Sequence, residues 1–82
     1  MNNTEYNNMI RALSRLLIIS VQIGQSEEIE EINRLVDFAQ GYLRALEEFK
    51  VMPQDVITET RIACLNRAAE RMLALNRRKK HE

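Results

Sequence analysis

Residues 26–49, SEEIEEINRLVDFAQGYLRALEEF, decide the fold of this 82-residue chain. Apolar residues recur in this stretch at spacings of three and four, which is the period of an α-helix that buries one face. Ser26 precedes a run of acidic residues and is a predicted N-cap. Four glutamates crowd the first turns, where the helix dipole favours negative charge: Glu27, Glu28, Glu30 and Glu31. We therefore expect a helix over residues 27–50.

Two further helices are predicted on either side of this stretch. Gly24 is expected to end the first, over residues 4–23, because glycine readily takes the left-handed conformation just past a helix end. Thr4 is a plausible N-cap for that helix. Pro53 disfavours helical backbone in the residue before it and suits the first turn of a third helix, near residues 54–78.

The short connections between these helices predict an all-α fold, a small bundle of three antiparallel helices that associates into a larger helical bundle. We expect one domain over residues 1–82, ending in a short basic tail over residues 77–82. Residues 1–60 hold ten acids and five bases, whereas residues 61–82 hold seven bases and two acids. Folding the third helix back therefore brings basic residues, Arg71, Arg77 and Arg78, toward the glutamates at 27–31. The alternative is two solvated helix ends, since exposed pairs contribute only about 0–1 kcal/mol.

The central helix carries more apolar surface than a triangle of helices needs. One stripe comprises Ile29, Ile32, Val36, Ala39 and Leu43, and a second comprises Leu35, Phe38, Tyr42, Ala45 and Phe49. Together they cover roughly 200° of the helix, against about 100° or more for an ordinary surface helix. The helix over residues 4–23 is nearly as wide. Its main face comprises Tyr6, Met9, Ile10, Leu13, Leu16, Leu17 and Val21, with Ile19 widening it and Ile18 behind.

A contiguous apolar patch usually marks an interaction site, so this surplus predicts a protein interface. Its candidate residues are Ile18, Ile19, Leu35, Phe38, Tyr42 and Phe49. The expected function is non-enzymatic, as an adaptor, small chaperone or regulator. The partner is either a second copy, because homodimers are the commonest oligomers, or a helical client. The alternative is a monomer whose middle helix uses both stripes internally.

A DNA- or RNA-binding regulator is the rival function. Its candidate contacts are Arg71, Arg77, Arg78, Lys79 and Lys80, a basic cluster able to grip phosphates. The formal net charge of zero, the lack of interleaved aromatic residues and the acidic turns expected nearby favour the protein partner instead.

No residue pattern predicts catalysis, a cofactor, a metal or a small-molecule substrate. His81 is next to last in the chain, and Cys64 lies on an apolar helix face where a free cysteine behaves as a small hydrophobe. Gly24 and Gly41 are isolated, so they form no phosphate-binding loop. The single cysteine, the lack of a cationic leader and the short apolar runs predict a cytoplasmic protein outside the membrane.

The segment from Leu13 to Ala39, two helices around Gly24, is broadly similar to the hairpin of tetratricopeptide-type repeats and of small secretion chaperones built from them. The small residues that let repeat helices approach are mostly replaced here by Leu17, Ser20 and Ile29. The resemblance implies a chaperone or adaptor role and transfers no functional residue.

Overall fold

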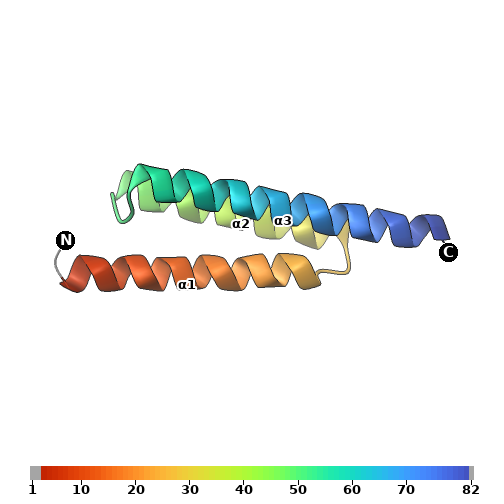
Figure 1. Ribbon diagram of the computed structural model, residues 1–82, viewed down its shortest axis with the longest axis horizontal. Helices are drawn as coiled ribbons and strands as arrows, with labels where there is room; N and C mark the ends of the chain where they lie inside the picture. Colours follow the sequence, from red (N-terminus) through yellow and green to blue (C-terminus); the bar gives the residue numbers. More distant parts are fainter. Residues whose placement is uncertain (1–2, 82) are drawn as a thin grey trace.

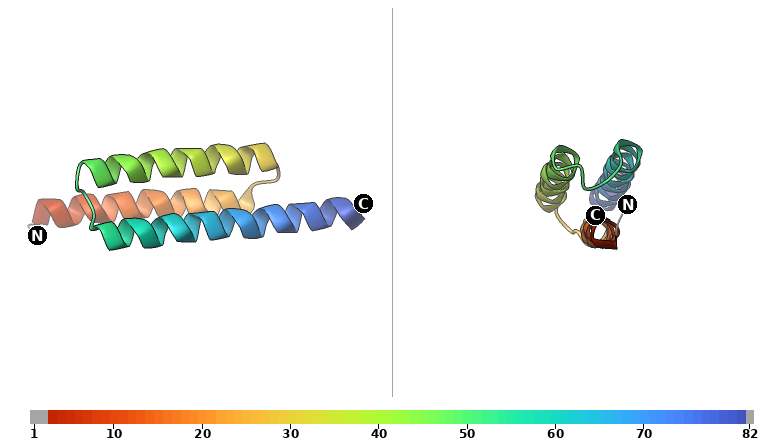
Figure 2. Two further views of the ribbon diagram at one scale, coloured as in Figure 1. Left: turned by 90° about the horizontal axis from the view of Figure 1, so that it is seen from above. Right: turned by 90° about the vertical axis from the view of Figure 1, so that its left-hand side faces the viewer.

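The computed structural model describes residues 3–81, which form three helices. They are α1 (Asn3–Gln25), α2 (Ile29–Glu48) and α3 (Gln54–His81). Each helix runs antiparallel to the one before it, so α1 and α3 point the same way (Figure 1). Seen end on, the helices stand at the corners of a triangle, and each packs against both others (Figure 2). The predicted bundle of three antiparallel helices is confirmed.

One continuous core runs along the axis of this triangle. It takes a single stripe of side chains from each helix, and apolar burial of this kind contributes about 1.5–3 kcal/mol per large side chain. The stripes are Ala12, Leu16, Ile19 and Ile23 in α1; Ile32, Leu35, Ala39, Leu43 and Leu46 in α2; and Ile57, Cys64, Ala68 and Leu75 in α3, with Met52 from the loop. Half-buried apolar residues such as Met9, Ile29 and Val51 pack against its edges.

The turn between α1 and α2 differs from the sequence prediction. Helix α1 continues through Gly24, which does not take a positive φ. Ser26 does not cap α2, because its hydroxyl donates to the carbonyl of Gln22 at 2.9 Å and so closes the end of α1. The N-cap position falls to Glu28, in extended backbone and without a side-chain hydrogen bond. Thr4 likewise lies inside α1, which already includes Asn3.

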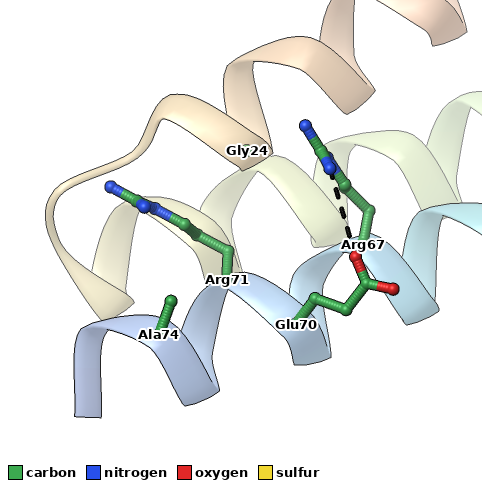
Figure 3. A pocket seen from close by; sticks show the side chains of 5 residues that line it. All are labelled: Gly24, Arg67, Glu70, Arg71 and Ala74. Carbon is green, nitrogen blue, oxygen red and sulfur yellow. Dashed lines mark ion pairs between the residues drawn. The ribbon is translucent and has the colours of Figure 1, made fainter. Parts of the chain in front are cut away.

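Gly24 makes room for a side chain of α3 instead of turning the chain. A Cβ built at Gly24 would lie 2.7 Å from Nε and 2.8 Å from Cζ of Arg67, too close for real atoms. Figure 3 shows Arg67 and Arg71 reaching from α3 toward the last turn of α1. Helix α3 also continues past its expected end at residue 78 to His81, because arginine and lysine are good helix formers and suit a helix C-terminus.

Helix α2 ends in a Schellman motif at Lys50. The backbone N–H of Lys50 donates to the carbonyl of Glu47 at 3.2 Å, and that of Val51 donates to the carbonyl of Leu46 at 2.9 Å. Lys50 has a φ of 54°, in the left-handed region where a Cβ crowds the backbone at a cost of about 1–2 kcal/mol. The next residue, Val51, packs against the core, and this contact keeps Lys50 in the strained conformation.

Replacing Lys50 with glycine should therefore stabilise the protein. We expect Lys50→Gly to raise the free energy of unfolding by about 1 kcal/mol, because glycine takes positive φ without a steric penalty. For a domain of this size that is a rise of roughly 4–8 °C in Tm, measurable by circular dichroism. The control, Lys50→Ala, keeps the Cβ and should stay within about 0.5 kcal/mol of the wild type. Equal stability of the two variants would show that the turn is unstrained.

Candidate protein-interaction surfaces

Three aromatic side chains of α2 form an exposed strip outside the core. The exposed fractions of Phe38 and Phe49 are 61% and 75%, and Tyr42 is half-buried. The Phe38 and Tyr42 rings, one helical turn apart, are stacked with 6.4 Å between centroids and 8° between planes. Phe49 continues the strip to the end of α2, beside Glu5 and Asn8 at the start of α1. This aromatic strip offers a large, rigid contact area of the kind that interfaces favour.

Two of the six candidate interface residues belong to the core instead. Ile19 is 6% exposed and Leu35 is 9% exposed. Each helix lies between two neighbours, so the shoulders of its buried stripe are covered along with the centre. The other four candidates, Ile18, Phe38, Tyr42 and Phe49, keep all or part of their side chains accessible.

A second exposed row lies on α1 and was not singled out from the sequence. It comprises Tyr6, Ile10, Leu13, Leu17 and Val21, of which Leu13 alone is half-buried. Sequence reasoning placed these residues on the main face of the helix together with Leu16. Their spacing of four, three, four and four residues is that of an apolar helical seam. This α1 row is displaced by one residue, about 100° around the helix, from the seam that enters the core.

An open, mostly apolar groove of about 340 Å³ runs beside the α1 row, between α1 and α3. Its walls are Leu13, Leu16, Leu17 and Ser20 of α1 and Glu59, Thr60, Ala63 and Cys64 of α3. Ser20, Thr60 and Ala63 are too small to fill the space between the two helices. The α1–α3 groove therefore continues the apolar surface of the α1 row toward α3.

Cys64 lies at the floor of this groove with 2% of its surface exposed. Burial raises the pKa of its thiol, because the charged thiolate is poorly solvated there. The thiol therefore stays protonated at neutral pH and behaves as a small apolar side chain. A chain that covers the groove should therefore lower the reactivity of this thiol toward thiol reagents.

The basic end of α3 is engaged by the acidic start of α2. Arg71 Nη2 lies 3.4 Å from Glu27 Oε1, and Arg78 Nη1 donates to Glu27 Oε2 at 2.9 Å. The approach predicted from the sequence is confirmed for these two arginines. Arg77 and Lys79 are exposed, and the side chain of Lys80 lies outside the described part of the chain. Two of the five candidate nucleic-acid contacts thus already hold a carboxylate.

Arg71 also fastens the turn between α1 and α2. Its Nε donates to the carbonyl of Ser26 at 2.8 Å, and Ser26 is 2% exposed. Without Arg71, the buried carbonyl of Ser26 would lose this hydrogen bond, and water has little access to replace it. Figure 3 shows the Arg71 side chain lying beneath the turn. The residue is therefore part of the fold.

Comparisons with protein-family models, with curated proteins and with solved structures find no match for this chain. Within residues 3–81, no helix combines the length and apolar character needed to cross a membrane. Among the described side chains, no group of three or more histidine, cysteine, aspartate or glutamate residues is placed to hold a metal ion.

Arg71 and Arg77 of α3 allow a matched test of the hydrogen bond between Arg71 and the Ser26 carbonyl. We expect Arg71→Met to lower the free energy of unfolding by about 1–3 kcal/mol, because the Ser26 carbonyl loses a charged donor. The same change at the exposed residue, Arg77→Met, should cost no more than about 0.5 kcal/mol. Urea unfolding followed by circular dichroism measures both values. Equal effects at the two positions would mean that Arg71 is a surface charge without a structural role.

Proposed function

We propose that this chain is a non-enzymatic helical interaction module, an adaptor, small chaperone or regulator that binds a helical surface of another protein chain. The observation that carries the proposal is the aromatic strip of α2, with its stacked Phe38 and Tyr42 rings. Large apolar side chains exposed side by side cost solubility, and they are typical of surfaces that a partner covers. Cytoplasmic location belongs to the same proposal, supported by the free thiol of Cys64.

The spacing of the strip suits the face of a partner helix. Phe38, Tyr42 and Phe49 are four and seven residues apart, so all three stand on one side of α2. Helix-in-groove recognition uses anchors at such intervals. The partner's own apolar anchors would pack beside the stacked Phe38 and Tyr42 rings and against Phe49. A partner helix therefore needs only an amphipathic face with apolar residues at matching intervals in order to bind this strip.

The basic end of α3 gives less support to nucleic-acid binding. Glu27 holds both Arg71 and Arg78, so phosphate would have to displace a carboxylate that is already in place. Arg77 and Lys79 are the exposed basic residues beside this pair. A small cluster of this kind gives weak binding that falls steeply with salt.

A pull-down from the native cells tests the proposal, using the wild type and two double variants. Phe38→Ser with Tyr42→Ser removes the two stacked rings of the aromatic strip, one exposed and one half-buried at the edge of the core, so most of the helicity should be retained. The control, Asp37→Ser with Arg44→Ser, changes two exposed residues elsewhere on α2 and leaves the net charge at zero. We expect the wild type and the control to capture the same protein in stoichiometric amounts. The amount of that protein recovered with the aromatic variant should fall at least tenfold.

Two results would contradict this function. The first is capture of the same proteins by all three forms, which would mean that the aromatic strip plays no part in binding. The second is material that is lost on nuclease treatment and on deletion of residues 77–82, which would favour the nucleic-acid alternative.

A further inference from the structure

We propose that a second copy of this chain docks in the α1–α3 groove, the two α1 helices packing antiparallel about a twofold axis. The inference rests on the proposed function and names the partner for one of its surfaces. It leaves the aromatic strip of α2 free for a different chain. Three observations carry it: the surface area of the monomer, the absence of charge in the second half of α1 and the self-matching spacing of four residues of the α1 row.

The isolated chain exposes more surface than a monomer of its mass. Its accessible surface is 6065 Å², whereas monomeric proteins of this mass expose about 5,100 Å². Its radius of gyration is 14.5 Å, against about 12 Å for a compact chain of this length. The bundle is a rod of 54 × 16 × 16 Å, and rods reduce their surface by pairing side by side. The excess, about 1,000 Å², is close to the roughly 800 Å² that each partner contributes to a stable interface.

The second half of α1 carries no charge that would keep two copies apart. Residues 16–26, LLIISVQIGQS, contain no acidic or basic side chain, although Leu17 is 66% exposed. Asn7 and Ser14, which flank the row on its outer side, are also uncharged. The α1 row itself contains no charged residue, and depletion of charge distinguishes the core of an interface from ordinary protein surface. A twofold axis places identical surfaces together, so a charged row would repel its own copy.

The first four residues of the α1 row match themselves when two copies lie antiparallel. Tyr6, Ile10, Leu13 and Leu17 are spaced four, three and four residues apart, a pattern that reads the same in both directions. Tyr6 then faces the partner's Leu17, and Ile10 faces the partner's Leu13. The small side chains of the groove, Ser20 and Ala63, leave room for the incoming helix. Aromatic anchors such as Tyr6 commonly dominate the energy of interfaces of this type.

Adjacent residues on α1 provide a matched test by light scattering at about 100 µM protein. Leu17→Glu and Ile18→Glu place the same charge in the same turn, at side chains that are 66% and 56% exposed. We expect the wild type and Ile18→Glu to have twice the chain mass of 9.6 kDa, and Leu17→Glu to have the mass of one chain. Circular dichroism should show equal helicity in all three, since neither side chain is in the core.

Cys64 supplies a second readout, specific to the groove. Its reaction with a thiol reagent should slow at least threefold when the wild type is concentrated from about 1 to 100 µM, whereas Leu17→Glu should show no such change. Phe38 on α2 and Leu65 on α3 are exposed outside the α1 row. A monomeric wild type, a dimeric Leu17→Glu variant, or a dimer broken by Phe38→Glu or Leu65→Glu instead would each overturn the proposal. A monomer that still captures a protein through Phe38 and Tyr42 would overturn the dimer alone and leave the proposed function standing.

Discussion

Burial of one apolar seam from each of three helices is the constraint on which the rest of this structure depends. A helix at the corner of a triangle has two neighbours, which together cover one side of it. Helices α1 and α2 carry apolar residues over a wider arc than two neighbours hide. The remainder, including Leu17 on α1 and Phe38 on α2, stays on the outside of the bundle. The same geometry that completes the core thus produces the surfaces proposed for binding.

The fold was predictable because its signals are local. Apolar periodicity, Pro53 and the acidic run at 27–31 place three helices within a few residues of their bounds. The details of the turns were not predictable, because they depend on groups brought together only by folding. Gly24 lies against the guanidinium of Arg67 from α3 instead of ending α1, and Ser26 closes α1 and accepts a hydrogen bond from Arg71 instead of capping α2. At Lys50 the tertiary contact of Val51 prevails over the usual preference for glycine.

The candidate surface was predicted only in part, for a reason that lies in α1. This helix has two apolar seams displaced by one residue, so Leu16 and Leu17 are equivalent by spacing and composition. The structure buries Leu16 and exposes Leu17, a choice determined by where α3 packs. The absence of charge over residues 16–26 is the sequence signal that would have marked the exposed seam. At the basic end of α3 the opposite charges of the sequence do meet, since Arg71 and Arg78 both pair with Glu27.

The most direct test of this account is an NMR sample that mixes isotope-labelled and unlabelled chains and detects proximity only between different copies. We expect cross-peaks from the Tyr6 ring to the Leu17 methyl groups of the other copy, as pairing through the exposed seam of α1 requires. Cross-peaks between copies from the core seam, at Leu16 or Ile23, would show that α1 pairs through that seam and not through the seam of Leu17. The absence of any cross-peak between copies would show that the exposed seam is not a surface for self-association.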